Sequence, residues 1–422
     1  MPKRSFPRLG AVLVPVVSAA VTAALVASAL SQPAAAPAPE GDSTSVMVDG
    51  VETLTNIESV AYTQAVAAAK TKKPKVTVIG TGGTISGVAT SRSSFQDYRS
   101  GQIAIGDMVG YLQPEIGAVA DVSTVQFGNK GSGGYTIPEF HALTLAVEKA
   151  LKSSDGVVVT TGTDTMEEFA YWLDLSVRSQ KPVVLTGAMR PWAAVAPDGP
   201  KVIGADGPAN LYNAIVLAAS QATYCYGTVL MLGDEFQAAR DVTKTSSYRM
   251  DTFQTREFGV LGWIDGTNIK VGRAPARVQE CDDKSKWYTP FNLTKVAPEA
   301  LPRVEVVTSY QQAGGEAITA FADAGVKGIV TAGTGAGGLS SAQGAARTAA
   351  AAKGVVFVST TRTGSGSVYG GSTTQPIIAG DDLLPQKARI LLLLSLAFAG
   401  GDVEKVRRWV TGLGNPEWDL GS

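Results

Sequence analysis

The chain has 422 residues, of which 45% are hydrophobic and 17% are charged, and its formal net charge is -1 at pH 7. This length and composition predict a globular protein of two or three domains with an apolar core. The near-neutral charge, and the lack of a basic stripe interleaved with aromatic residues, argue against nucleic acid or an anionic surface as its partner.

The N-terminal residues have the pattern of an export signal. Basic residues at positions 3, 4 and 8 precede a nearly unbroken apolar run, Ala11–Leu30, and small residues at Ala27–Ala29 and Ala34–Ala36 offer cleavage sites. The run is also long enough to span a bilayer as an uncleaved anchor, but the Ala- and Pro-rich stretch after it favours cleavage. We therefore expect a signal peptide over residues 1–36 and a secreted or periplasmic protein. Residues 37–73 are expected to form a linker or N-terminal extension.

Residues 74–274 show short β-branched runs that alternate with longer amphipathic segments, and this predicts a large α/β domain with a doubly wound, mostly parallel sheet. The expected strands are Lys75–Ile79, Val119–Gln126, Gly156–Thr160, Pro182–Thr186 and Gly227–Leu232. The expected helices are Gly106–Leu112, Pro138–Lys152, Asp164–Arg178 and Pro208–Ala222. Asp164 precedes Glu167 by three residues, so it is a candidate helix cap. Asp241–Gly262 is expected to be irregular or a hairpin.

A Pro- and charge-rich stretch over residues 275–302 predicts an interdomain linker, and residues 303–422 predict a smaller C-terminal α/β domain. The strands expected there are Arg303–Thr308, Gly328–Thr331 and Val355–Ser359. The helices expected there are Glu316–Ala324, Leu339–Lys353, Pro385–Ala399 and Asp402–Thr411. Gly364–Gly371 is either a flexible spacer or a loop that faces a ligand.

Glycine- and threonine-rich turns follow two of the expected strands. Thr81-Gly82-Gly83-Thr84 follows the first strand, and Thr161-Gly162-Thr163-Asp164-Thr165 follows the third. Ligands of open parallel sheets bind beyond the carboxyl ends of the strands, so both turns can meet one small substrate. Glycine allows close approach of the backbone, and threonine supplies a hydroxyl group. The competing interpretations are an ordinary strand exit and a phosphate-binding turn.

The scarcity of histidine and cysteine limits the chemistry. His141 is the one histidine, and with two cysteines the chain lacks the ligands of an ordinary zinc site, so we predict neither a metal nor a cofactor. We expect His141 to be a packing or surface residue, which leaves Lys, Asp or Tyr as the proton acceptor. Lys244 could activate a threonine with help from an aspartate, although a surface lysine is the default for any single position. The backbone N–H groups of Thr84 and Thr163 could bind an oxyanion.

Together these segments resemble the bacterial asparaginase/glutaminase family, and most closely its exported type II L-asparaginases. The segments that carry the resemblance are Val78–Ser86, Val159–Glu168, Leu185–Pro191, Asp206–Ala214, Arg240–Thr245 and Pro385–Arg389. They follow the family's order and span most of the chain from residue 74 onward. The resemblance implies an amidohydrolase that converts L-asparagine and water to L-aspartate and ammonia.

The resemblance also implies catalytic roles. Thr84 would be the nucleophile, and Tyr98, on a lid formed by residues 87–101, would assist it. Thr163, Asp164 and Lys244 would form a second cluster that polarises Thr163 and a water molecule. A long polar loop of this kind is also suited to excluding water from a site.

Four further contacts with the substrate are implied by the resemblance. Gly83 would bind the substrate through its backbone, and Ser132 would bind the α-carboxylate. Asp164 would bind the α-ammonium group, and the carbonyl group of Ala188 would contact the leaving amide.

The chain departs from the family pattern at several positions. Thr161 stands where the family usually has histidine. In many members an asparagine and an acidic residue of a neighbouring subunit complete the pocket, whereas here Ala336 stands near the position of the asparagine and Thr361–Gly371 contains no evident acidic residue. Cys225 and Cys281 lie away from the family's cysteine pair, and the sequence leaves open whether they form a disulfide.

The partner expected from the resemblance is a small molecule, L-asparagine or possibly L-glutamine, and the expected assembly is a homotetramer. One methylene group separates the two substrates, so glutamine as a main substrate is one alternative. The other is an inactive α/β protein that binds a small ligand such as a nucleotide.

Overall fold

The computed structural model describes residues 47–48, 51–52 and 72–418. Residues 1–69 and 70–422 form two separate units. In the first unit, β1 (Met47–Val48) pairs with β2 (Val51–Glu52) in antiparallel fashion. The predicted signal peptide and most of the predicted extension lie outside the described residues. Within those residues, no helix has both the length and the apolar character needed to cross a bilayer.

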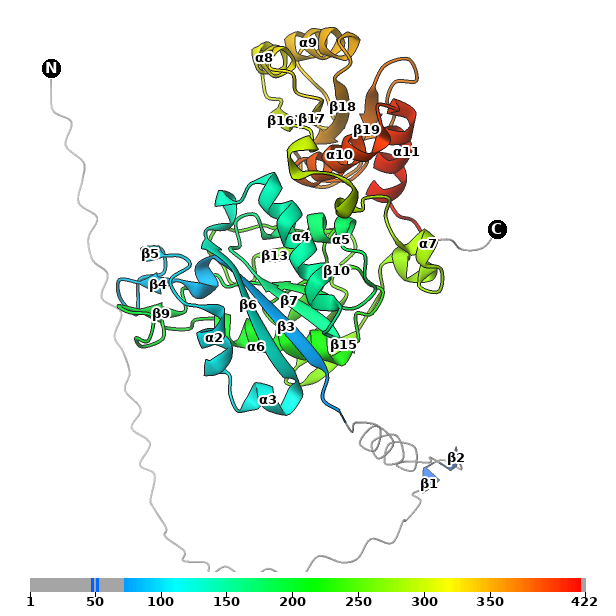
Figure 1. Cartoon of the computed structure of the whole chain (residues 1–422). Coiled ribbons are helices and arrows are strands. Elements are labelled where there is room, and N and C mark those ends of the chain that lie inside the picture. Colours follow the sequence, from blue (N-terminus) through cyan, green and yellow to red (C-terminus); the bar gives the residue numbers. More distant parts are fainter. Residues whose placement is uncertain (1–46, 49–50, 53–71, 419–422) are drawn as a thin grey trace, which may run out of the picture. The chain divides into compact units, whose positions relative to one another are not determined.

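The larger sheet of the second unit has eight strands in the order β15-β14-β11-β10-β8-β7-β3-β6. Its parallel strands are β3 (Lys75–Gly82), β6 (Asp121–Lys130), β7 (Gly156–Thr160), β8 (Val183–Thr186) and β10 (Thr228–Leu232). Its antiparallel strands are β11 (Glu235–Ala238), β14 (Gly262–Asp265) and β15 (Asn268–Val271). In Figure 1, β3 lies between β6 and β7. The chain therefore reverses its winding direction between β3 and β7, which is where ligands bind in such sheets.

Helices cover both faces of this sheet. One face carries α2 (Ile105–Tyr111), α3 (Glu115–Val119) and α6 (Gly207–Ser220), and the other carries α4 (Ile137–Leu151) and α5 (Met166–Ser176). Successive strand side chains point to opposite faces, so Val78 packs with the α6 side and Ile79 with the α4 and α5 side. Burial on both faces explains the continuous apolar runs of these strands.

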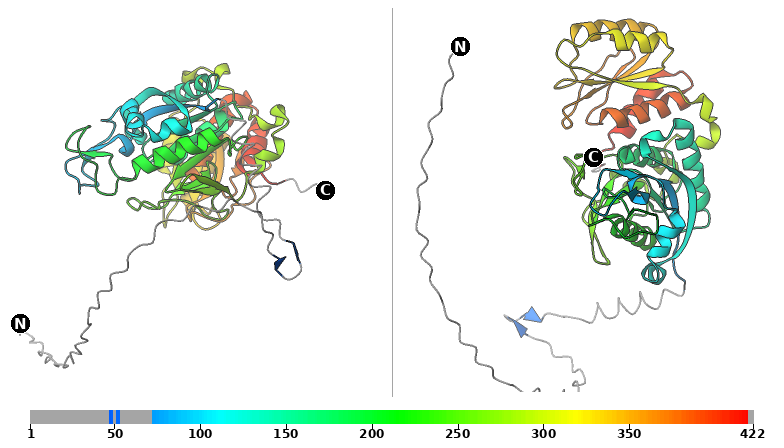
Figure 2. Two further views of the ribbon diagram at one scale, coloured as in Figure 1. Left: turned by 90° about the horizontal axis from the view of Figure 1, so that it is seen from below. Right: turned by 90° about the vertical axis from the view of Figure 1, so that its left-hand side faces the viewer.

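The smaller domain contains four parallel strands in chain order. They are β16 (Val304–Thr308), β17 (Gly328–Gly333), β18 (Val356–Thr361) and β19 (Ile377–Ala379). Its helices are α8 (Glu316–Asp323), α9 (Ser341–Ala352), α10 (Pro385–Ala399) and α11 (Val403–Gly414). Figure 2 shows α8 and α9 on one face of this sheet and α10 and α11 on the other. Both domains therefore have the predicted α/β architecture.

The structure corrects several predicted element boundaries. The first strand continues to Gly82 because its end pairs with Lys130, and the second begins at Asp121 because Val119 belongs to α3. The prediction omitted β11, β14, β15 and β19 and a small sheet of β4 (Val88–Ala89), β5 (Tyr98–Arg99) and β9 (Ala193–Ala194). Within residues 241–262 the chain forms a hairpin of β12 (Val242–Lys244) and β13 (Phe253–Thr255).

The segment between the two sheets, residues 275–302, packs against the helices around it. It contains 3-10 turns η3 (Ala276–Glu280), η4 (Leu293–Lys295) and η5 (Pro298–Ala300) and helix α7 (Lys284–Trp287). Trp287 and Phe291 are buried, and the latter belongs to the core of α4, α5 and α10. His141 is also buried here, and its Nε2 lies 2.9 Å from the carbonyl oxygen of Leu293 and 3.0 Å from that of Val296. The histidine therefore holds this segment to α4.

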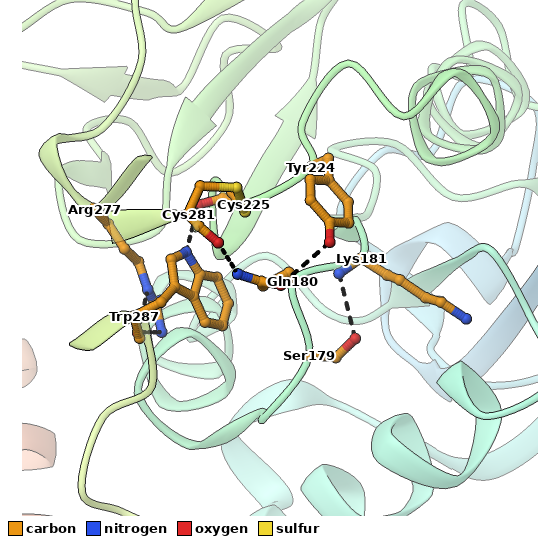
Figure 3. The surroundings of a disulfide bond; sticks show 8 residues. All are labelled: Ser179, Gln180, Lys181, Tyr224, Cys225, Arg277, Cys281 and Trp287. Atoms are coloured by element: carbon orange, nitrogen blue, oxygen red, sulfur yellow. Dashed lines mark hydrogen bonds between the residues drawn. A yellow bond between two sulfur atoms is a disulfide. The ribbon is translucent and has the colours of Figure 1, made fainter. Parts of the chain in front are cut away.

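Cys225 and Cys281 form a disulfide, with their Cα atoms 5.7 Å apart. The indole Nε1 of Trp287 donates to the carbonyl group of Cys225 at 2.9 Å, and the side-chain amide of Gln180 donates to that of Cys281 (Figure 3). The bond joins the start of β10 to the segment that leads to the smaller domain. It closes a loop of 56 residues in the unfolded chain.

Replacing both cysteines by serine is expected to lower the free energy of unfolding by about 2–4 kcal/mol, because the unfolded chain regains the freedom that the cross-link removed. Urea unfolding of the double variant and of the parent protein, each with and without reductant, measures the difference. Reductant should lower the stability of the parent and leave the double variant unchanged. Coincident curves for all four samples would contradict the prediction.

Candidate active site

The first turn brings Thr84 to the end of β3. Gly82 and Gly83 have φ values of 106° and 84°, a region that glycine enters at low cost. A Cβ atom on Gly83 would lie 2.2 Å from the backbone nitrogen of Gly162, which belongs to the second turn. The two turns are therefore in direct backbone contact, as the sequence predicted. Thr84 begins the 3-10 turn η1 (Thr84–Ser86) and is buried.

Tyr98 reaches Thr84 from the loop predicted as a lid. Its hydroxyl oxygen lies 2.6 Å from Oγ1 of Thr84. β5 carries Tyr98 and pairs with β4, which in turn pairs with β9. A Cβ atom on Gly87 would lie 2.9 Å from the ring of Tyr98, so the glycine leaves space for the ring. The loop that was predicted to be a lid is thus held by a three-stranded sheet, and this places the hydroxyl group of Tyr98 next to that of Thr84.

An amine from another strand meets the hydroxyl group and the carboxylate of the second turn. Nζ of Lys244 donates to Oγ1 of Thr163 at 3.0 Å and to Oδ1 of Asp164 at 2.7 Å. The side chain of Lys244 is 14% exposed, while that of Asp164 is 85% exposed. Lys244 lies at the end of β12, opposite Phe253 of β13. It is therefore a largely buried side chain directed at Thr163, and the surface-lysine interpretation is wrong.

Asp164 is not the helix cap that the spacing predicted. Helix α5 begins at Met166, its N-cap residue is Thr165, and no side chain caps it. The carboxylate of Asp164 pairs instead with Lys244. The capping-box interpretation is therefore wrong, because an ammonium group within reach competes for the carboxylate.

Ser132 lies against the second turn. It is buried in the 3-10 turn η2 (Ser132–Gly134), and its Oγ accepts a hydrogen bond from the backbone N–H of Thr165 at 3.2 Å. A Cβ atom on Gly162 would lie 3.0 Å from the same Oγ. The hydroxyl group of Ser132 thus faces the junction at which the two turns meet.

Ala188 is buried just beyond the end of β8. The residues that follow it are fixed by Asp206, whose carboxylate accepts the backbone N–H groups of Met189 and Arg190, each at 2.9 Å. Burial raises the pKa of Asp206, and these hydrogen bonds oppose that effect. A Cβ atom on Gly187 would lie 3.5 Å from Cγ2 of Thr163, so this strand end borders the second turn.

The positions at which the chain departs from the family pattern lie outside the hydrogen bonds of this site. Among the described residues, Ala336 and the loop 361–371 make no hydrogen bond to Thr84, Tyr98 or Lys244. The loop with Ala336 is closed by hydrogen bonds between Thr334 and Gly338, and a Cβ atom on Gly364 would meet the guanidinium group of Arg256. Oγ1 of Thr161, where the family usually has histidine, has no hydrogen-bond partner among the described residues.

The sequence predicted no role for residues 385–389, although they form one of the segments that resemble the family. At the start of α10, Gln386 donates to the carboxylate of Glu167 on α5 at 3.0 Å, and Lys387 is buried beneath the strand that carries Lys244. No three His, Cys, Asp or Glu side chains gather as possible metal ligands in the part of the chain that the structure describes.

Two hydroxyl groups at adjoining strand ends, one beside a phenol and one beside an amine, are suited to an enzyme that attacks a substrate with an activated hydroxyl group. Two family models match the chain: "Asparaginase, N-terminal" matches residues 75–277, and "Glutaminase/Asparaginase C-terminal domain" matches residues 303–410. The chain belongs to the asparaginase/glutaminase family, whose members hydrolyse asparagine.

Individual relatives cover most of the chain. A probable periplasmic L-asparaginase of Haemophilus influenzae is 38% identical over 76% of this chain and 88% of its own. A glutaminase-asparaginase of Acinetobacter glutaminasificans is 34% identical over 77% of this chain and 95% of its own. The crystal structure of a probable cytoplasmic L-asparaginase from Campylobacter jejuni superposes with a TM-score of 0.73 at 34% identity, covering 80% of this chain and 99% of that one.

Proposed function

We propose that this protein hydrolyses the side-chain amide of L-asparagine to give L-aspartate and ammonia, with Thr84 as the nucleophile. The observation that carries the proposal is the meeting of two pairs at one sheet edge. Thr84 is hydrogen-bonded to Tyr98, and Thr163 is hydrogen-bonded to Lys244. Each pair joins a hydroxyl group to a group that can accept or relay its proton.

In the first step, Oγ1 of Thr84 attacks the amide carbon, and its proton is relayed through the hydroxyl group of Tyr98. The N–H groups of Thr84 and Thr163 hold the oxyanion of the tetrahedral intermediate, and one such donor typically contributes about 3–4 kcal/mol. The carbonyl group of Ala188 accepts a hydrogen bond from the leaving amide. The proton taken from Thr84 is returned to that nitrogen, so ammonia departs and a β-aspartyl ester remains on Thr84.

In the second step, water attacks the ester. Thr163 orients the water molecule, and the water's proton is relayed through Thr163 and Lys244 to the carboxylate of Asp164, which lies 2.7 Å from Nζ of Lys244. Collapse of the intermediate releases aspartate and returns a proton to Thr84. The use of an amine where many hydrolases use an imidazole agrees with the position of His141, which is bonded to Leu293 and Val296.

Recognition of the amino-acid part of the substrate is assigned to three residues. The hydroxyl group of Ser132 and the backbone of Gly83 receive the α-carboxylate, and Asp164 receives the α-ammonium group. The carboxylate of Asp164 is largely exposed in the single chain. A neighbouring subunit of a homotetramer would cover it, and Ala336 would then leave the ammonium group with fewer partners than an asparagine would give.

Ammonia release from L-asparagine and L-glutamine, measured in parallel, tests the proposal. We expect L-asparagine to be the better substrate. A relative named glutaminase-asparaginase supports the alternative that glutamine is a main substrate, and one methylene group changes binding by only about 1–3 kcal/mol. Release from neither amino acid would indicate an inactive binding protein and contradict the proposal.

We also propose that the protein is exported and loses its signal peptide. One relative is named periplasmic, and the disulfide of Cys225 and Cys281 is typical of an oxidising compartment. N-terminal sequencing of protein recovered outside the cytoplasm tests this. A mature chain that begins near residue 37 would agree, and an intact Met1 would contradict it.

Replacing Tyr98 by phenylalanine is expected to lower kcat about 100-fold with little change in KM, because the ring is kept and the proton relay to Thr84 is lost. Steady-state ammonia release measures both constants. Tyr288→Phe is the matched control, since this tyrosine packs against Arg178 and away from the lid. Equal activity of the two variants would remove Tyr98 from the mechanism.

A further inference from the structure

One fully buried lysine has no part in the reaction described above. Lys387 lies in the first turn of α10 and is 0% exposed. Its Nζ donates to the carbonyl oxygen of Ala239 at 2.7 Å, to that of Arg240 at 2.8 Å, and to that of Val242. An ammonium group has three N–H donors, so all three are used by main-chain acceptors.

This position is costly for a lysine. Burial lowers the pKa of Lys387 to about 8, and the nearby charges of Glu167 and Asp241 oppose that effect. An apolar side chain would avoid the cost of burying a charge, but it would leave three carbonyl groups without a partner. The contacts therefore indicate that the role of Lys387 is to hold the segment that carries these three carbonyl groups.

That segment leads directly to Lys244. Residues 239–241 join β11 to β12, and Lys244 is the last residue of β12, two positions after Val242. The smaller domain also holds the segment through Arg240, which pairs with Asp382 and donates from Nε to the carbonyl oxygen of Gly414 at 2.9 Å. Of these contacts, the hydrogen bond from Lys387 to Val242 lies nearest to Lys244 along the chain, because Val242 is already part of β12.

The same turn of α10 also contacts the other half of the second cluster. The side-chain amide of Gln386 donates to Oε1 of Glu167 at 3.0 Å. Glu167 lies in the first turn of α5, which begins directly after the turn that contains Thr163 and Asp164. The first turn of α10 is thus hydrogen-bonded both to β12, which carries Lys244, and to α5, which follows Thr163 and Asp164 in the chain.

We propose that Lys387 is a positioning residue, which holds the start of β12 so that the amine of Lys244 reaches Thr163 and Asp164. The inference rests on the proposed role of Lys244 in the reaction. It gives the smaller domain a role in the active site of its own chain. That role is to fix the distances from the amine of Lys244 to the side chains of Thr163 and Asp164.

Lys387→Met removes the donors and keeps the length of the side chain. Because small displacements of a reacting group have large effects, we expect kcat to fall about tenfold or more. Lys387→Arg keeps a positive charge and several donors, so we expect it to fold and to keep more activity than Lys387→Met. Leu392→Ala is the matched control: Leu392 is buried in α10, and a Cβ atom on Gly328 of β17 would lie 2.8 Å from its side chain, so it faces the sheet of the smaller domain. Thermal unfolding of each variant shows how much stability was lost.

A double-mutant cycle separates positioning from general loss of stability. Each Lys387 variant is made in the parent chain and in Lys244→Met, and ammonia release from L-asparagine is measured for all. If Lys387 acts through Lys244, the loss seen in the parent should shrink to less than about twofold in the Lys244→Met background.

Three results would overturn the inference. The first is an equal loss in both backgrounds, and the second is an equal loss of kcat in Leu392→Ala at matched thermal stability. The third is parent-like kcat in Lys387→Met. A Lys244→Met enzyme with parent-like activity would instead remove the proposed role of Lys244, and this inference with it. Should Lys387→Met fail to fold, Lys387→Arg is judged by the same cycle.

Discussion

Replacing Thr84 by valine is expected to lower kcat by about 10⁴-fold or more while the fold is kept, because the nucleophile is removed. Valine has nearly the shape of threonine, so the buried space beside Tyr98 stays filled. The variant loses the 2.6 Å contact between Oγ1 of Thr84 and the hydroxyl group of Tyr98. A hydrogen bond of this kind contributes about 1 kcal/mol to stability, so only a small change in thermal unfolding is expected.

The matched control for this variant is Thr223→Val. Thr223 is also buried, and its Oγ1 has no hydrogen-bond partner among the described residues. The same chemical change should therefore leave both turnover and stability close to those of the parent. Ammonia release and circular dichroism, measured on both variants, give the comparison. Near-normal turnover by Thr84→Val would exclude Thr84 as the nucleophile.

Replacing Lys244 by methionine is expected to lower kcat by about 100- to 1,000-fold, the size of effect usual for a lost general base. The variant removes the hydrogen bonds to Thr163 and Asp164, so the water molecule of the second step is no longer activated. The step that forms the ester should be less affected. Stopped-flow measurements should then show a burst of one ammonia per site, followed by slow turnover.

Stability should change little in this variant, because Asp164 is largely exposed and exposed ion pairs contribute about 0–1 kcal/mol. Lys353→Met is the matched control. Lys353 also pairs with an aspartate, Asp323, at 2.9 Å, but this pair lies in the smaller domain, where Lys353 directly follows α9 and Asp323 ends α8. It should keep the activity of the parent. A Lys244→Met enzyme with no burst and unchanged kcat would contradict the proposed role of the amine.

The central parallel strands β3, β7, β8 and β10 were predictable because burial on both faces leaves a plain signal in the sequence. The strand Gly156–Thr160 and the helix Pro385–Ala399 have the predicted bounds. Short antiparallel strands gave a weaker signal: residues 262–265 alternate between buried and exposed, but over only four positions. Such a run is too short to separate from an irregular segment by its period alone.

The site was predictable to a similar extent. Contact between the two turns followed from their places at the ends of neighbouring parallel strands, and the structure shows it at Gly83 and Gly162. Local spacing favoured a cap for Asp164, because its partner Lys244 is 80 residues away along the chain, and the family resemblance alone placed the two residues in one cluster. The contact of Lys387 with residues 239–242 crosses still more of the sequence, and only the packing of α10 reveals it.

The central claim is that the hydroxyl group of Thr84 becomes covalently attached to the substrate. Rapid acid quenching of the enzyme during turnover of L-asparagine, followed by peptide mass mapping, tests it most directly. We predict one β-aspartyl group on the peptide that contains Thr84, in larger amount in Lys244→Met and absent from Thr84→Val. The same group on the peptide that contains Thr163, with Thr84 unmodified, would contradict the account.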